Sequence, residues 1–135
     1  MQWRMMVELS GTDGSVQTHE VHVGGCLPAA CSAATLGLTQ AQAKQLLSEL
    51  QRHLVQAQTE EYCRSRRRCP RCGTHRPLKD RRPRQLRSLY GVVTVRAPRF
   101  APCRCSVGHR QTLSPVGEIM PDRCTPEYER TLAEM

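Results

Sequence analysis

Four cysteines in two close pairs have the types and spacing of a metal site. Cys69 and Cys72 are separated by two residues and followed by Gly73, whereas Cys103 and Cys105 are separated by one. Two thiolates at C-x2-C can turn toward one tetrahedral ion, and a glycine after them lets backbone amides approach the sulfur atoms. The thirty residues between the pairs have room for one hairpin, as in a zinc ribbon. The pattern predicts one structural Zn²⁺ bound by four thiolates, with no open position for catalysis.

Three further side chains compete for this expected site. His109 lies four residues after the second cysteine pair, and His75 lies three residues after the first pair. Cys63 precedes the first pair by six residues. Both histidine nitrogen and cysteine sulfur are ordinary zinc ligands, so three cysteines with one histidine remain an alternative to four cysteines. A chain with no metal is the remaining alternative.

The other cysteines do not form a second complete site. Cys26 and Cys31 have a C-x4-C spacing without a matching second half, and we expect them to be small buried thiols. Cys124 lies near Glu127, a pattern too general for a nucleophile, so we expect an inert thiol. The first residues have no signal-peptide pattern, and no stretch is apolar enough to span a membrane. A reducing cytoplasm is therefore expected, which favours metal binding over disulfides.

Positive charge is concentrated around the expected metal site. Residues 64–110 contain fifteen basic side chains, nearly all arginine, and a single acidic one, Asp80. So many like charges repel one another, and a polyanionic partner would relieve that repulsion. The arginine fork suits phosphate and guanine edges. The residues predicted to contact nucleic acid are Arg64, Arg66, Arg67, Arg68, Arg71, Arg76, Lys79, Arg81, Arg82, Arg84, Arg87, Arg96 and Arg99.

The elements that must position these groups begin with a hairpin and a linker over residues 1–38. Period-two apolar residues, the turn-rich SGTDGS and the extended HEVHV predict two antiparallel strands over 1–23. His19 and His22 are three residues apart, so in a strand they would point to opposite faces, which argues against joint metal binding. Residues 24–38 are small and contain Gly and Pro, as in a linker.

A long amphipathic helix is predicted over residues 39–63. Thr39 and Gln42 have the spacing of a capping box, and apolar residues recur near the 3.6-residue period up to Tyr62. A single apolar stripe on so long a helix needs a partner. That partner is the hairpin or a second copy of the chain, so a homo-oligomer through this helix is expected as one alternative.

The remaining segments are a basic zinc-ribbon module over residues 64–110 and a linker with the start of a helix over 111–135. A hairpin with a turn at Tyr90–Gly91 is predicted within the module, its second strand ending near Pro98 and Pro102. Thr125 and Pro126 predict the N-cap and first residue of the last helix, which stops in mid-pattern and suggests a truncated chain.

The overall class predicted is α+β. Apolar residues are scarce, with one Trp and one Phe in 135 residues and a formal net charge of +8. This composition approaches that of chains that do not fold unaided. A metal, a partner chain or a missing remainder of the protein must therefore supply part of the stability.

Several of these motifs together resemble a known family. From about Leu36 to Met135 the chain resembles the N-terminal region of insertion-sequence transposases of the ISKra type. The segments that carry the resemblance are LTQAQAKQLLSELQRHLVQAQ, CPRCGTHRPLKD, RSLYGVVTVRAPRFAPCRC and SPVGEIMPDRCTPEYERTLAE. The most specific features are Lys79–Asp80 after the first cysteine pair, the turn from Arg87 to Gly91, and Pro98–Arg99 before the second pair.

The resemblance implies a protein of a mobile element that functions in DNA recombination. Such a transposase binds transposon-end DNA through its N-terminal part and cuts DNA with a metal-dependent RNase-H-like domain that carries an acidic triad. No acidic cluster of this chain fits that triad, so no catalytic residue is assigned and the chain resembles a fragment. The implied setting is the bacterial cytoplasm, on the nucleoid when the protein is bound.

Three other functions compete with DNA binding. A zinc-stabilised protein-interaction module that oligomerises through residues 39–63 is the main alternative. RNA binding is weaker, because only Tyr90 and Phe100 could stack on bases in the basic region. An independent enzyme is the weakest, since no Ser-His-Asp, P-loop or H-E-x-x-H pattern is present.

Overall fold

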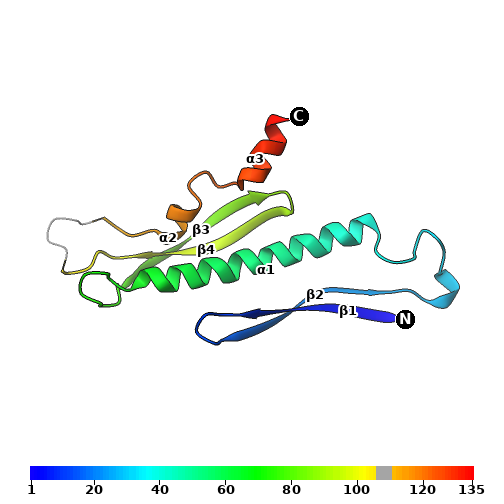
Figure 1. The fold of residues 1–135 in the computed structure, drawn as a ribbon, viewed down its shortest axis with the longest axis horizontal. Coiled ribbons are helices and arrows are strands. Elements are labelled where there is room, and N and C mark those ends of the chain that lie inside the picture. Colours follow the sequence, from blue (N-terminus) through cyan, green and yellow to red (C-terminus); the bar gives the residue numbers. More distant parts are fainter. Residues whose placement is uncertain (106–110) are drawn as a thin grey trace. The chain divides into compact units, whose positions relative to one another are not determined.

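The fold is mixed α+β, as predicted from the sequence (Figure 1). The computed structural model describes residues 1–105 and 111–135. The chain divides into two compact units, Met1–Leu54 and Val55–Met135, and the long helix α1 (Gln40–Arg67) contributes to both. The four segments expected from the sequence are thus grouped into two units. In the described part of the chain, no helix is both long and apolar enough to cross a lipid bilayer.

The first unit begins with the predicted hairpin. Strand β1 (Gln2–Ser10) pairs antiparallel with β2 (Val16–Gly25). The Asp13 carboxylate accepts a hydrogen bond from the Ser15 amide at 2.9 Å within the connecting turn. Gly14 adopts a φ of 81°, which a side chain would disfavour. Turn chemistry therefore fixes where the two strands reverse.

A β-bulge in this hairpin changes the faces of its histidines. The register of the two strands shifts at Val21, which is not paired with a residue of β1. Val21 and His22 are both buried although they are adjacent in the strand. His19 is partly buried, whereas Glu20, which lies between His19 and Val21, is exposed. The extra residue inverts the alternation of side chains, so the prediction that the two histidines lie on opposite faces is wrong. His19 stacks on His53 of α1, with 4.0 Å between ring centroids.

Helix α1 starts where the capping box predicted. The Thr39 amide donates to Gln42 Oε1 at 2.9 Å, and the Gln42 amide donates to Thr39 Oγ1 at 3.2 Å. The helix continues to Arg67, four residues beyond the predicted end at Cys63. Its last turn is basic, and positive side chains there interact favourably with the negative end of the helix dipole.

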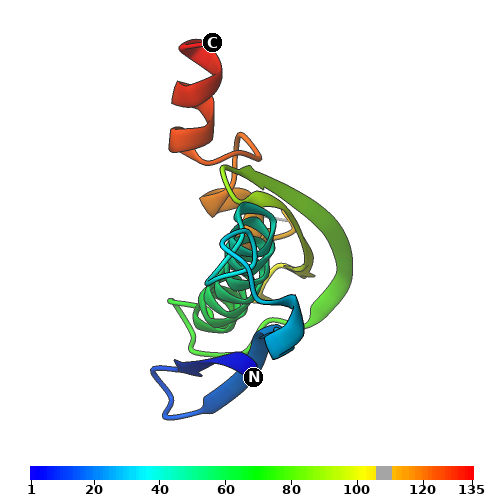
Figure 2. The ribbon, with the colours of Figure 1, turned by 90° about the vertical axis from the view of Figure 1, so that its right-hand side faces the viewer.

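The second hairpin consists of β3 (Leu78–Ser88) and β4 (Gly91–Phe100), joined by two residues. The turn lies where the sequence predicts it. Pro83 lies inside β3, and Pro98 lies inside β4, which ends at Phe100, between Pro98 and Pro102 as predicted. Both strands of a two-stranded sheet are edge strands, which are the strands of a sheet that tolerate proline. Figure 2 shows the pronounced curvature of this hairpin.

The core of the second unit lies on one face of this hairpin. A short helix, α2 (Pro115–Ile119), which the sequence does not predict, covers that face. Val116 of α2 is 1% exposed. The buried cluster consists of Val55, Cys63, Leu86, Val93, Val95, Ala97, Val116 and Met120. The last helix, α3 (Pro126–Ala133), has the predicted N-cap, because Thr125 Oγ1 accepts a hydrogen bond from the Tyr128 amide.

Candidate metal centre

The first cysteine pair lies in a tight turn directly after α1. The Gly73 amide donates to the carbonyl oxygen of Cys69 and the Cys69 amide donates to that of Thr74, both at 2.9 Å. Gly73 has a φ of 71°, the left-handed region that glycine occupies without strain. This turn aims Cys69, which is buried, and Cys72, which is exposed, in the same direction.

The second pair reaches the first through the β3–β4 hairpin. Strand β4 returns from the turn at Tyr90, and the Ala101 amide donates to the Pro77 carbonyl oxygen at 2.9 Å. The strand ends at Phe100, so Cys103 and Cys105 lie after it, in irregular chain that includes a turn at Arg104–Cys105. The two cysteine pairs are thereby brought together across more than thirty residues of chain.

The four sulfur atoms are arranged as the ligands of one ion. Cys72 Sγ lies 3.2 Å from Cys103 Sγ, and Cys69 Sγ lies 3.6 Å from Cys105 Sγ. All four Sγ atoms lie within 4.8 Å of one another. A tetrahedral zinc–thiolate site with bonds of about 2.3 Å has sulfur atoms separated by roughly 3.8 Å. The observed distances fall on both sides of that value, so the cluster could hold a metal ion.

The protein environment sets very different acidities at these thiols. Hydrogen bonds from the Thr74 hydroxyl and amide, with a further contribution from Cys103, lower the pKa of Cys72 to about 6. The amides of Cys72 and Arg71 lower the pKa of Cys69. Hydrogen bonding to Cys103, Cys69 and Cys72 raises the pKa of Cys105 to about 12. Four thiolates so close together repel one another, and a cation at their centre would remove that repulsion.

The competing ligands are excluded from this cluster where the structure describes them. Cys63 is 4% exposed and belongs to the apolar core, where burial raises the pKa of its thiol. His75 is exposed and is not a member of the sulfur cluster. His109 lies outside the described residues. Among the described residues, the four-cysteine set is the group that could bind a metal.

Several of the predicted nucleic-acid-binding arginines are engaged within the protein. Arg66 Nε and Nη2 each donate to the Glu118 carboxylate at 3.1 Å, and the Tyr62 hydroxyl donates to the same group at 3.0 Å. Arg99 forms a bidentate pair with Asp80, its neighbour across the β3–β4 hairpin. These pairs depend on strand register and on α2, which residue spacing alone does not give.

Backbone carbonyl oxygens engage further arginines. Arg76 donates to the Arg66 carbonyl oxygen at 2.9 Å, and Arg67 donates to that of Arg76 at 3.1 Å. Arg84 donates to the carbonyl oxygen of Met120. These contacts fix the end of α1 against the segment that leads into β3 and fix β3 against α2. Part of the arginine content therefore supports the fold around the cysteine cluster.

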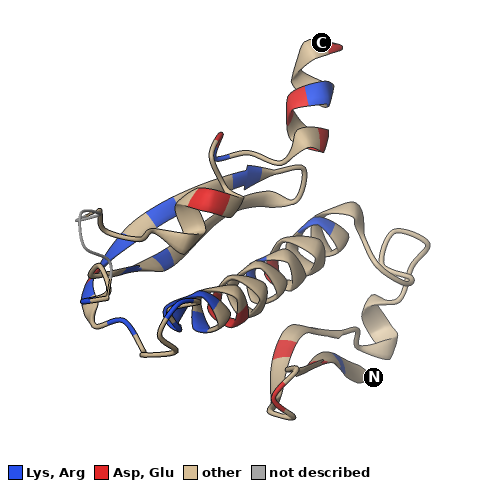
Figure 3. Cartoon of the chain, turned by 60° about the vertical axis from the view of Figure 1, so that its left-hand side comes forward, with Lys and Arg blue, Asp and Glu red and all other residues tan. Residues whose placement is uncertain are grey.

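The remaining predicted residues present charge to solvent. Lys79 is exposed and donates to Thr112 Oγ1 at 3.1 Å. Arg82 approaches Asp80 at 3.7 Å, with its side chain 67% exposed. The end of α1 and both strands of the second hairpin carry basic residues (Figure 3). The remaining exposed members of the predicted set, apart from Arg67, are Arg64, Arg68, Arg71, Arg81, Arg87 and Arg96.

Among the cysteines outside the cluster, the burial of Cys26 and Cys31 differs from that expected from the sequence. Cys26 is partly buried and Cys31 is exposed, with 3.5 Å between their sulfur atoms, so the prediction of small buried thiols is wrong. Cys124 donates to the Glu129 carboxylate at 2.9 Å, and that bond raises the pKa of its thiol. A raised pKa disfavours the nucleophilic thiolate and agrees with the expectation of an inert group.

Comparison with known proteins adds no relative. Neither a protein-family model, nor a curated protein, nor a solved structure matches this chain.

Proposed function

We propose that the Val55–Met135 unit is a zinc-stabilised DNA-binding module from the N-terminal region of a transposase. The observation that carries the proposal is the coincidence of the four-sulfur cluster with the basic surface built around it. This unit contains seventeen basic and eight acidic residues, whereas Met1–Leu54 contains three basic and four acidic ones. The transposase assignment rests on the sequence resemblance, which makes transposon-end DNA the proposed ligand and the bacterial nucleoid the proposed setting.

Zinc is the metal that the ligand chemistry favours. Four thiolates in a closed tetrahedral arrangement are typical of structural zinc, and such a site leaves no position for substrate. An iron ion can also occupy four thiolates, so the metal must be measured. Elemental analysis of protein purified without chelators should find one zinc per chain. One iron per chain would overturn the zinc assignment and leave the cluster itself intact.

DNA binding would be mainly electrostatic. Arginines that neutralise phosphates release counterions, so affinity should fall steeply as salt rises. The exposed basic residues of α1 and of the hairpin belong to a unit whose elements the cysteine cluster joins, which keeps their spacing fixed. Contacts of this kind position a protein on a duplex, and only contacts to base edges select a sequence.

The test is a salt titration of duplex binding by fluorescence anisotropy. Replacing Arg68 and Arg87 by glutamine should reduce the slope of log affinity against log salt by about one per lost phosphate contact. The matched control replaces Arg4 and Lys44 of the first unit, which removes the same charge. If the full chain with bound metal shows no duplex binding even at low salt, the proposed function is refuted.

Oligomerisation through α1 is the second candidate function. In the first unit none of the leucines of this helix is buried, and Leu47 is 42% exposed. A second copy could cover this apolar stripe. Light scattering should then show a dimer that Leu47→Glu converts to a monomer. A monomer at all concentrations would refute this candidate without affecting the DNA proposal.

A further inference from the structure

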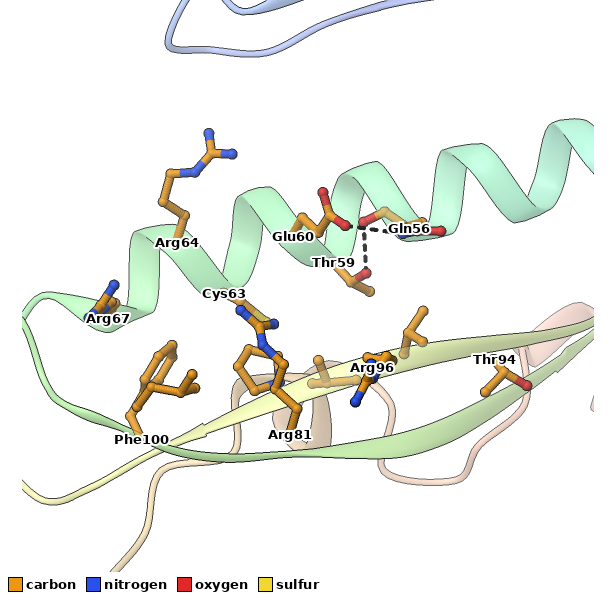
Figure 4. Close-up of a pocket in the computed structure, with 14 residues that line it drawn as sticks. Gln56, Thr59, Glu60, Cys63, Arg64, Arg67, Arg81, Thr94, Arg96 and Phe100 are labelled. Atoms are coloured by element: carbon orange, nitrogen blue, oxygen red, sulfur yellow. Dashed lines mark hydrogen bonds between the residues drawn. The ribbon is translucent and has the colours of Figure 1, made fainter. Parts of the chain in front are cut away.

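A groove lies between the second half of α1 and one face of the β3–β4 hairpin (Figure 4). Its volume is about 720 Å³. The helix contributes Thr59, Cys63 and Arg67 to its lining, and β4 contributes Thr94 and Arg96. All of these residues belong to the Val55–Met135 unit, so the groove is a feature of one compact body.

The strand register decides which basic residues enter this groove. Thr94, Arg96 and Pro98 alternate along β4 and therefore share one face. Arg81 is paired with Pro98 and lines the groove from β3. Arg82, the next residue along β3, is paired with the buried Ala97 and does not line the groove. Of these two neighbouring arginines, Arg81 lines the groove and Arg82 does not.

The groove has an excess of positive charge on its inner side. Arg81 and Arg96 are exposed, and neither has a hydrogen-bond or ion-pair partner among the described residues. In Figure 4 the Arg81 side chain extends from the strand toward the helix. The acidic lining residue, Glu60, already accepts a hydrogen bond from Gln56 at 3.2 Å. An anion entering the groove would therefore meet donors that the fold itself does not use.

Apolar side chains complete the lining. Leu78 is 45% exposed at the start of β3, beside Phe100 at the end of β4. The Arg67 guanidinium lies 6.0 Å from the centroid of the Phe100 ring. A ligand that combines phosphates with flat apolar surfaces fits this mixture, since arginine planes pair with phosphates and also stack on bases.

We infer that this groove binds the backbone of a single unpaired nucleic-acid strand. The inference rests on the proposed function and adds that the nucleic acid bound in the groove is single-stranded. A volume of about 720 Å³ is that of a small-ligand pocket, so it admits a short stretch of one strand. A double helix, whose major groove alone is about 12 Å wide, can contact only the rim. Arg81 and Arg96 are the residues that bind the strand's phosphates.

The experiment compares two neighbouring arginines of one strand, Arg81, which lines the groove, and Arg82, which does not. The full chain with bound metal is titrated with a short labelled oligothymidylate and, separately, with a labelled duplex of the same length. Arg81→Gln and Arg96→Gln should each weaken single-strand binding about tenfold, the loss of roughly one charged hydrogen bond. Arg82→Gln, which removes the same charge next to Arg81, should weaken it no more than twofold. Circular dichroism and metal content of each variant confirm that it is folded.

Each outcome separates this inference from the proposed function. Equal losses for the Arg81, Arg82 and Arg96 variants would overturn the groove while leaving DNA binding in place. Absence of binding to both probes would refute the proposed function itself. Displacement of the oligothymidylate by polyglutamate of equal charge would show that the groove accepts an acidic peptide as well, and would overturn its assignment to a nucleic-acid strand.

Discussion

The chain contains two groups of cysteines that differ in what surrounds them. In Val55–Met135, four sulfur atoms lie within 4.8 Å of one another, supplied by two turns at the base of a hairpin. In Met1–Leu54, Cys26 and Cys31 form a pair with 3.5 Å between sulfur atoms and no further ligand group among the described residues. Similar sulfur–sulfur distances therefore occur in a group of four cysteines that could hold a metal ion and in a pair without further ligand groups.

The difference lies in the long-range part of the structure. The C-x2-C turn would bring two sulfur atoms together in any chain, and the β3–β4 hairpin brings the other two to the same place. The Cys26–Cys31 loop contains a 3-10 turn at Pro28–Ala30, but among the described residues no strand returns to it with a second cysteine pair. Two thiolates leave half of a tetrahedral ion uncovered, so we expect structural metal only at the four-cysteine cluster.

The largest expected effect is on metal content and folding. Cys103→Ser should abolish metal binding and unfold the second unit, because a structural zinc site contributes on the order of 10 kcal/mol to folding. Cys31→Ser is the matched control and should leave metal content and thermal unfolding unchanged. Elemental analysis and circular dichroism measure both. Loss of metal in the Cys31 variant would show that the pair belongs to a metal site after all.

The rate of thiol alkylation should differ between the four-cysteine cluster and the Cys26–Cys31 pair by at least an order of magnitude. Bound metal protects its ligands, whereas Cys31 is exposed and should be alkylated by iodoacetamide. The hydrogen bond with Cys26 raises the pKa of Cys31, so the reactive thiolate of Cys31 forms at higher pH than that of an unperturbed cysteine. Alkylation of Cys31 should consequently increase with pH beyond the point at which an unperturbed cysteine levels off. Mass spectrometry of tryptic peptides gives the rates, and a plateau at the ordinary value would contradict the prediction.

Local signals in the sequence predict much of this comparison and miss its long-range part. The C-x2-C-G turn, the Thr39 capping box and the Tyr90–Gly91 turn act within a few residues, and the structure contains each of them. The bulge at Val21, which changes the face of His22, is a register effect that period-two reasoning cannot detect. Burial of the two thiols in the linker was predicted wrongly for a related reason, since burial depends on what packs against a loop.

The split between structural and exposed arginines is also long-range. Asp80 lies close to several arginines in sequence, but only the strand register selects Arg99 as its partner. Glu118 reaches Arg66 across fifty-two positions because α2 packs near the end of α1. Charge counts alone gave all of these arginines the same predicted role. A contact between distant segments decides which of them support the fold.

A smaller effect is expected from the ion pair near the four-cysteine cluster. The hydrogen bond from Arg66 lowers the pKa of Glu118 in the folded protein. The pair therefore stabilises the fold at pH values above the pKa of the carboxyl in the unfolded chain. This stabilisation is lost as the pH falls through the lower pKa of the folded state. Both side chains are partly exposed, so Glu118→Gln should cost no more than about 1 kcal/mol. The variant should be less stable than the parent near neutral pH and nearly equal to it in acid. Urea titrations at several pH values test this, with Glu134→Gln, at the C-terminal end of α3, as the control.

The smallest expected effect concerns the loop that positions the Cys26–Cys31 pair. Thr35 Oγ1 donates to the Ala30 carbonyl oxygen and accepts from the Ser32 amide, both at 2.9 Å. Thr35→Val keeps the shape of the side chain and removes both bonds, so the two sulfur atoms should separate for more of the time. The pKa of Cys31 should then return toward the ordinary value, and its alkylation near neutral pH should accelerate about two- to threefold, as loss of a net hydrogen bond of modest strength implies. Thr131→Val in α3 removes a comparable hydroxyl bond to Glu127 and should leave the rate unchanged. An unchanged rate in the Thr35 variant would mean that the backbone alone positions the pair, which would make the loop more rigid than its exposed hydrogen bonds suggest.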